Sequence, residues 1–521
     1  MVNLLTSLNT ATEALRVSQY GMGIVGSNIA NMNTEGYSKQ RLDQKTVSYG
    51  HQLIGSVDID RVLRYQDEFL NTFMMQENCS YQYESKFAEG LTNLETYFND
   101  ADGSGLVGAF QDYFSAAATL AGDPTNQVAR SNFVVAADTV AKEFNKKFNQ
   151  LTTYRENLVG DGSSTTSVKS SEIYNMTQTL NKKLEEVAIL NLEISHFTVG
   201  DASKPNILLD QRQSLIDEIS SYIPLTVKQE SDVLNLSIGN VSLVSSGEQV
   251  GFFEVGFTAP PENINNPATV TLSDKDGNKL IQNYATEYPT AKGSIKAVLD
   301  LASNGATGIK SAIDTLDNLA KEFAREVNAI QLKTEIDPDT GKTKATLKLN
   351  STTGKLEVAT ENIFLNDDNS ALYDPDLITS GNIRINKAVL SNPSEIATAY
   401  DFVTGTPPVP EKPDAVGNNN NALLFSQMRD IKLSALGNQT VEKGLYSLAA
   451  EIGNNSALQQ SKLETQELSL NQLKEKRQSI TGVSLDEELV DLLKYQRAYQ
   501  ASGQVFSTIN TMLDVIINMV S

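Results

Sequence analysis

Several residue types are scarce in this chain of 521 residues, and each scarcity narrows the chemistry open to it. Cys79 is the only cysteine, so the chain can form neither an internal disulfide nor a cysteine-based metal cluster. His51 and His196 are the only histidines, which excludes His-rich metal sites and most triads built on a histidine base. Tryptophan is absent. We therefore expect no metal and no cofactor.

Basic residues are also scarce relative to acidic ones. The chain has 42 Lys and Arg against 64 Asp and Glu, a formal net charge of -22, which argues against nucleic acid as a partner. No run of eighteen apolar residues predicts a membrane span, and the first residues lack the pattern of a cleaved secretory signal. These signals alone predict a cytoplasmic protein, and they leave open export by a machine that needs no such signal.

The stretch from Val483 to Val520 has an apolar residue at every seventh position. These residues are Leu485, Leu492, Tyr499, Phe506, Leu513 and Val520. We expect Leu489 and Ile517 to add an intermediate row, which Gln496, Gly503 and Asn510 interrupt. A heptad repeat keeps one side of a helix against a partner helix and predicts a coiled coil. The alternative is an ordinary amphipathic core helix.

The N-terminal region has the same geometry. Apolar or small residues alternate at spacings of four and three: Leu4, Leu8, Ala11, Leu15, Ser18, Met22, Val25 and Ile29. Gly21, Gly23 and Gly26 lie within this helix, where each glycine is unfavourable, so we expect another backbone to approach closely there. We predict that the two terminal helices pair. Because a single seam returns less free energy than the ordering of these helices costs, we expect them to be mobile in the monomer and ordered on assembly.

Between the ends, the pattern predicts a mainly α, multidomain protein. Helical periodicity covers residues 67–99, 106–120, 173–194 and 207–223, and Asp123 with Pro124 predicts the start of a further helix that reaches Val159. Helix is also expected at 293–329, 422–436 and 444–478, whereas Val233 to Ile238 alternates as a strand does. We assign residues 1–60 with 481–521 to a terminal coiled-coil assembly domain. A helical bundle takes 61–224, 291–332 and 422–480, and inserted β-rich domains take 225–290 and 333–421.

Candidate chemical sites all have simpler interpretations. Gly21-Met22-Gly23-Ile24-Val25-Gly26 matches a dinucleotide-binding pattern, but it lies inside a helical repeat rather than between a strand and a helix. The Asp337 to Lys342 stretch resembles part of a calcium loop and is expected to be a plain turn. Cys79 is expected to be a packed thiol, and His196 a solvated helix end. Asp486, Glu487 and Glu488 are expected in the first turn of a helix, where the dipole favours acids.

The two ends also carry motifs. The stretch SNIANMNTEGYSKQ, with Asn28, Asn31, Gly36 and Tyr37, resembles the N-terminal motif of bacterial flagellar axial proteins, the rod, hook and hook-associated proteins. The stretch GVSLDEELVDLLKYQRAYQASGQVFSTINTMLDVIINM resembles the C-terminal motif of the same family, with Tyr495, Gln496, Arg497 and Tyr499. Within the family, these residues are most similar to the hook-associated member at the junction between hook and filament.

This resemblance implies a structural protein that assembles helically through its terminal helices, and not an enzyme. It implies hook protein on one side, hook-associated protein 3 on the other, and an export chaperone that holds the C-terminal helix. It also implies secretion to the flagellum by the type III apparatus without a cleaved signal peptide. The alternatives are hook protein itself or another axial component, and a carbohydrate-cleaving enzyme on a helical scaffold, because carboxylates are plentiful.

Overall fold

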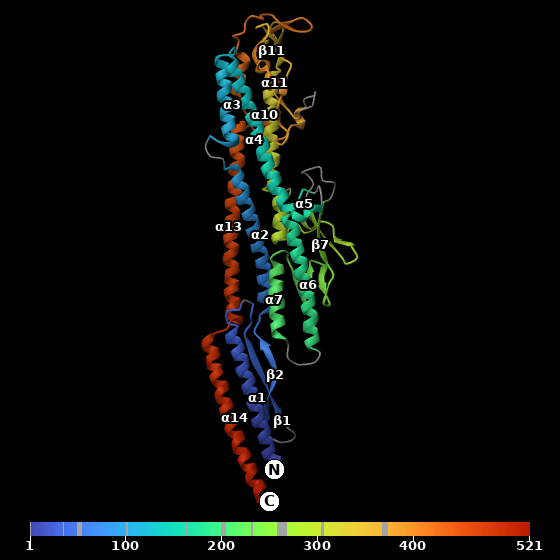
Figure 1. Ribbon diagram of the computed structural model, residues 1–521, viewed down its shortest axis with the longest axis vertical. Helices are drawn as coiled ribbons and strands as arrows, with labels where there is room; N and C mark the ends of the chain where they lie inside the picture. The colour runs from blue at the N-terminus through green and yellow to red at the C-terminus, as the bar shows by residue number, and fades with distance from the viewer. Residues whose placement is uncertain are drawn as a thin grey trace.

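The computed structural model describes residues 2–34, 36–48, 55–99, 103–161, 165–198, 205–230, 233–257, 268–303, 307–366 and 374–520. The molecule is an elongated rod in which the first and last helices lie together at one end (Figure 1). Long helices run along the rod, and small sheets lie on its side and at its far end. The predicted class, mainly α with inserted β-rich parts, is confirmed. No helix of the described residues is long and apolar enough to cross a membrane.

The rod is built from long helices. They are α1 (Val2–Ala30), α2 (Glu68–Phe98), α3 (Gly105–Gly122), α4 (Gln127–Val159), α6 (Glu172–Thr198), α7 (Asn206–Ser220), α9 (Ser294–Ala302), α10 (Ile309–Gln331), α13 (Val441–Thr481) and α14 (Leu485–Val520). Shorter helices are α5 (Thr165–Ser170), α8 (Tyr284–Glu287), α11 (Lys387–Ser391) and α12 (Asn420–Gln427).

The strands form five small antiparallel sheets in the described residues. The first is a hairpin of β1 (Gln40–Ser48) and β2 (Gly55–Arg64). The second and third, β3 (Thr226–Glu230) to β6 (Glu248–Gln249) and β7 (Phe252–Phe257) to β9 (Lys279–Ile281), lie beside α6; they contain β4 (Val233–Ile238), β5 (Val241–Ser245) and β8 (Ala268–Ser273). The fourth contains β10 (Thr334–Ile336), β11 (Thr343–Leu349), β12 (Leu356–Val358), β15 (Ala397–Thr404) and β16 (Val409–Pro410). The fifth pairs β13 (Phe364–Leu365) with β14 (Arg384–Ile385).

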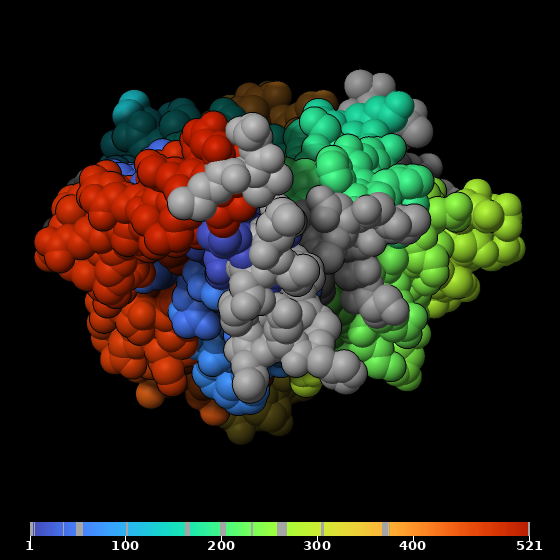
Figure 2. Space-filling view, turned by 90° about the horizontal axis from the view of Figure 1, so that it is seen from below, coloured from blue at the N-terminus to red at the C-terminus, as the bar shows by residue number. Residues whose placement is uncertain are grey.

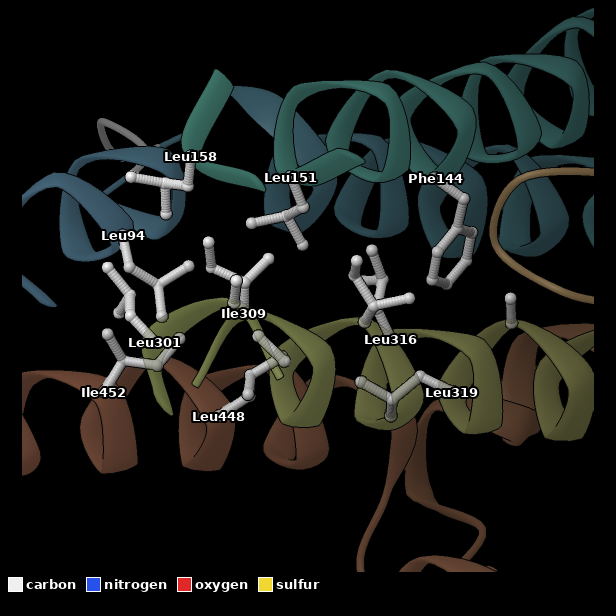
Figure 3. Close-up of a cluster of buried hydrophobic side chains, with 14 of the residues drawn as sticks. Leu94, Phe144, Leu151, Leu158, Leu301, Ile309, Leu316, Leu319, Leu448 and Ile452 are labelled. Atoms are coloured by element: carbon white, nitrogen blue, oxygen red, sulfur yellow. The ribbon is translucent and has the colours of Figure 1, made fainter. Parts of the chain in front are cut away.

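One hydrophobic core runs along the bundle. Figure 3 shows part of it, where Leu94 of α2, Leu151 of α4, Leu316 of α10 and Leu448 of α13 point into the space between their helices. Along each of these helices the core residues recur at helical intervals, so each helix presents one continuous apolar stripe to its neighbours. The fourth sheet has a separate small core of Ala345, Leu347, Leu356, Ala399 and Val403.

Three helix predictions are wrong in detail. The helix expected to begin after Asp123 begins at Gln127, because the carboxylate of Asp123 accepts bonds from Thr125 and the side chain of Asn126 caps the helix instead. The helix expected at 293–329 is divided into α9 and α10, since the backbone of Gly308 turns back against the carbonyl of Leu301. The helix expected at 422–436 ends at Gln427 and continues as two 3₁₀ turns.

Candidate assembly interface and its joint with the bundle

The terminal helices α1 and α14 lie side by side below the bundle, and the β1–β2 hairpin packs against α1 (Figure 1). Seen from below, the C-terminal part of the chain covers one side of the N-terminal part (Figure 2). Two short links, 65–67 and 482–484, connect this terminal unit to α2 and α13. We call α1, α14 and the β1–β2 hairpin the terminal unit.

On α1, the predicted seam faces α14 and the hairpin. Ala11, Ser18 and Val25 are buried, each about 4% exposed, and Leu4, Leu8, Leu15, Met22 and Ile29 are half-buried. On α14, Leu492, Phe506 and Leu513 are half-buried, whereas Leu485 and Tyr499 are 42% and 41% exposed. The side chain of Val520 lies outside the described part of the chain. The role of these residues in assembly stays a prediction.

The intermediate row expected on α14 is wrong. Leu489 and Ile517 are 44% and 62% exposed and do not belong to the buried row. A second row of buried or half-buried positions lies three residues after the predicted heptad residues, and it consists of Glu488, Tyr495, Ser502, Ile509 and Ile516. Two of these five side chains are polar, so an apolar pattern could not find the row.

Gly21 is where the two helices approach most tightly. A Cβ atom on Gly21 would lie 2.5 Å from Cε1 of Tyr495, so the tyrosine ring takes the space that a side chain on α1 would fill. By contrast, a Cβ on Gly23 or Gly26 would meet nothing within 4 Å. The expectation of close approach therefore holds at Gly21, against a side chain rather than a backbone, and fails at the other two glycines.

Asn28 lies at the end of the terminal unit that adjoins the bundle, where it connects three elements of the unit. Its Nδ2 donates to the carbonyl of Gln40 at 2.9 Å and to a carboxylate oxygen of Glu488 at 2.9 Å. Its Oδ1 accepts from the Gln40 amide at 3.0 Å and from the Tyr37 hydroxyl at 2.8 Å. Asn28 and Glu488 are each 1% exposed, so four bonds satisfy a buried amide and hold α1, β1 and α14 together.

Lys39 supplies the charge that Glu488 needs once it is buried. Its Nζ lies 3.2 Å from Glu488 and 2.8 Å from Glu487, and its backbone amide donates to the carbonyl of Thr481 at the end of α13. Burial lowers the pKa of Lys39, but the bonds to the two glutamates outweigh it, so the pKa is raised overall. The start of α14 is therefore fixed by charge as well as by packing.

A second ion pair connects the same loop to α7. Asp210 accepts from the Ser38 amide at 3.2 Å and from Arg64 at 2.9 Å. Burial raises the pKa of Asp210 and the adjacent guanidinium of Arg64 opposes that shift. Burial also raises the pKa of the Tyr37 hydroxyl, which keeps it protonated as a donor to Asn28. These contacts join the terminal unit to the bundle through side chains as well as through the two links.

The remaining motif residues have local roles or none in the described structure. Gly36 has a φ of +80°, the left-handed conformation that glycine adopts without strain, and it passes close to Ser214 of α7. Asn31 donates to the carbonyl of Ser27 in the last turn of α1. Gln496 and Arg497 are exposed on α14. Within the motifs, the structure thus brings together Asn28, Gly36 and Tyr37, while Tyr495 packs separately on Gly21.

The other candidate sites have plain structural explanations. Gly21, Gly23 and Gly26 all lie within α1, which has no preceding strand in the described residues, so the dinucleotide pattern is accidental. Asp337 caps the β10–β11 turn by accepting from the amides of Asp339 and Thr340. Cys79 is buried, and burial raises its pKa to about 12. His196 is exposed near the end of α6, and His51 lies outside the described residues. Among the described residues, no group of His, Cys, Asp and Glu could hold a metal ion.

The sequence interpretation missed the acidic and basic residues of the joint. Glu488 was expected only to favour the dipole of α14, whereas it is buried and bonded to Asn28. No sequence pattern indicated Arg64 and Asp210, because their pairing depends on the approach of α7 to β2. One available signal was that Glu488 lies three residues after Leu485, on the face of α14 that packs against α1.

These features define a class of protein: an elongated structural rod with paired terminal helices at one end, held to the bundle by a buried polar joint. Three family models match the chain. The flagellar hook-associated protein FlgK helical domain matches residues 91–344, the flagella basal body rod protein model residues 8–37, and the flagellar basal body rod FlgEFG protein C-terminal model residues 476–519.

Full-length relatives agree with these matches. The chain is 25% identical to flagellar hook-associated protein 1 of Bacillus subtilis, over 99% of both chains. It is 24% identical to the protein of the same name from Salmonella typhimurium, over 98% of this chain and 99% of that protein. The flagellar hook junction protein FlgK from Burkholderia pseudomallei shares the fold, with a TM-score of 0.56 and 15% identity over 79% of this chain and 100% of that chain. The chain is therefore similar over nearly its whole length to flagellar hook-associated protein 1, and it is a structural protein of the bacterial flagellum that assembles with other axial proteins.

Proposed function

We propose that this chain forms the junction between hook and filament, and that it assembles helically through α1 and α14. The observation that carries the assembly part is the outward surface of α14. Nine of its large apolar side chains are at least 41% exposed: Leu485, Leu489, Val490, Leu493, Tyr499, Val505, Met512, Val515 and Ile517. A helix with large apolar side chains on its outward surface needs a partner there, and α1 covers only one side of α14.

The scarcity of charge supports the same conclusion. Glu13 and Arg16 are the only charged residues of α1, and Asp514 is the only one between Ala498 and Val520 of α14. A helix surface that stays in water normally carries many charges, as α13 does between Lys462 and Arg477. The terminal unit is therefore built to be buried against further copies of this chain, as a repeating contact that does not close.

The partners and route follow from the family. We propose flagellar hook protein below the junction, hook-associated protein 3 above it, and an export chaperone that covers the apolar face of α14 beforehand. Export would use the flagellar type III apparatus without a cleaved signal peptide. We propose no enzymatic activity, because the buried carboxylates of the joint, Asp210 and Glu488, are each held by a cation.

A pair of substitutions tests the assembly surface. Met512 is 51% exposed on α14 and Leu468 is 65% exposed on α13. We expect Met512→Lys to leave the melting temperature of the monomer unchanged but to abolish incorporation into flagella and swimming. Leu468→Lys, a charge at an exposed position on the bundle, is the matched control and should incorporate normally. Normal incorporation of Met512→Lys would contradict the proposal, as would an equal loss in both variants.

A further inference from the structure

Each of the five described sheets is joined to a long helix through a side-chain carboxamide. In four of them, an asparagine makes two hydrogen bonds to the backbone of a single strand residue, donating to its carbonyl and accepting from its amide. The four pairs are Asn28 with Gln40, Asn181 with Phe253, Asn191 with Leu234, and Asn328 with Phe364.

The distances are similar in all four pairs. The bond from Nδ2 to the strand carbonyl is 2.9 Å for Asn28 and 2.8 Å for Asn181, Asn191 and Asn328. The bond from the strand amide to Oδ1 lies between 2.9 and 3.3 Å. A carboxamide presents one acceptor and one donor in the same plane, as the backbone of a neighbouring strand does. Each asparagine therefore makes the pair of hydrogen bonds that one residue of an adjacent strand would make.

Each described sheet has at least one such anchor. On α6, Asn181 holds the β7–β9 sheet and Asn191 holds the β3–β6 sheet, roughly 15 Å apart along the helix at 1.5 Å per residue. On α10, Asn328 holds β13. Gln331, one turn later, donates to the carbonyl of Glu395 and accepts from the amide of Ala397, the first residue of β15.

The anchors lie where apolar packing alone would not fix the orientation of a sheet relative to its helix. Asn191, Asn328 and Gln331 are at most 3% exposed, in helix stripes that are mostly apolar. Apolar contacts are non-directional, whereas a pair of hydrogen bonds to one residue fixes both register and orientation. A buried carboxamide without partners is costly, so only the docked arrangement of each sheet satisfies it.

We infer that these five carboxamides are positioning residues that set how each sheet sits on the helical rod, sheet by sheet. This inference does not depend on the proposed function, because it concerns how the body of the rod holds its sheets. It assigns a purpose to polar residues in the core that no catalytic or ligand-binding role explains.

Two isosteric substitutions test the inference in the full chain. Asn181→Asp and Asn328→Asp keep the side-chain size, but each removes the donor and places a negative charge against a strand carbonyl. We expect hydrogen exchange to accelerate by at least about tenfold in the sheet whose anchor is changed, because a bonded pair is lost. The acceleration should be confined to peptides that contain Phe253 in the first variant and Phe364 in the second. Asn175→Asp, exposed on α6, is the control and should change neither.

The outcomes separate an anchor from ordinary packing. Unchanged exchange at the anchored strand would overturn the inference, and so would an acceleration spread evenly over both sheets and the bundle. Because Asn328 is buried and its variant could unfold, the half-buried Asn181 provides the second arm. Loss of helical circular dichroism in Asn181→Asp would also overturn the inference, since an anchor for one sheet should not unfold the rod.

Discussion

Asn28 and Glu488 are 460 positions apart in the sequence and are joined by a buried hydrogen bond of 2.9 Å. The bond ties the end of α1 to the start of α14, at the level where both meet the bundle. Lys39, which pairs with Glu488, also donates through its backbone to the last residue of α13. The position of the terminal unit on the rod therefore depends on a few buried polar groups.

The first prediction concerns Asn28. In Asn28→Asp, a second carboxylate would face Glu488 inside the joint, and the donor to Gln40 would be lost. We expect a loss of roughly 1–3 kcal/mol from the free energy that holds α1, β1 and α14 together, as for other buried groups left unsatisfied. Limited proteolysis within 31–39 and 482–484 would measure it. The control is Asn9→Asp, at an exposed position on the same helix, which should be cleaved no faster than the unmodified chain.

The second prediction compares two glycines of α1. Gly21→Ala would drive a methyl group into the ring of Tyr495 at 2.5 Å, and overpacking of this kind costs roughly 1–3 kcal/mol. Gly23→Ala meets open space and should stabilise the helix by roughly 0.8–1.0 kcal/mol. Unfolding of α1 in urea, monitored by the exchange of its amide hydrogens, distinguishes the two variants. Equal effects of both substitutions would show that α1 and α14 do not pack as described.

The third prediction uses the single thiol. Cys79 is 2% exposed, and burial raises its pKa to about 12, so at pH 8 the native chain holds it as an unreactive thiol. We expect iodoacetamide to label Cys79 only after denaturant unfolds the bundle around α2. Raising the pH from 7 to 9 should barely increase labelling of the native protein. Rapid labelling of the folded chain would mean that this part of the core opens readily.

The fourth prediction concerns pH and the β10–β11 turn. Hydrogen bonding to Lys344 and to backbone amides lowers the pKa of Asp337 to about 2, below the value of about 3.9 in an unfolded chain. Since the folded pKa is depressed, the stabilisation is complete above the unfolded value and is lost as pH falls through about 2. Exchange at the amides of Asp339 and Thr340, which donate to the Asp337 carboxylate, should lose protection in that window. Asp337→Asn should remove this pH dependence.

The sequence predicted the helical rod and the positions of many of its helices, because long apolar stripes depend only on local spacing. The strand at Val233 to Ile238 was found in the same way, from strict alternation. The second row of α14 was misplaced because Glu488 and Ser502 are polar, and packing against α1 rather than hydrophobicity selects them. The joint could not be predicted, since Arg64, Asp210 and Glu488 meet only after α7, β2 and α14 are in place.

The helix break between Ala302 and Ile309 was missed for a related reason. Its only local signals are glycines, and the backbone of Gly308 folds against carbonyls of α9 in a way that no periodicity reveals. The sheet anchors were partly visible, because Asn191 interrupts an apolar stripe on α6. A buried asparagine in such a stripe indicates a directional contact, but the partner strand is known only from the fold.

The most direct test of the central claim is hydrogen exchange of α1 and α14 in the isolated monomer and in the assembled form. If the terminal unit is the assembly interface, its amides exchange much faster than those of α4 and α10 in the monomer and become protected on assembly, while the bundle is unchanged. If α1 and α14 are already as protected as α4 in the monomer and gain nothing on assembly, they are ordinary core helices. The assembly surface would then have to lie elsewhere on the rod.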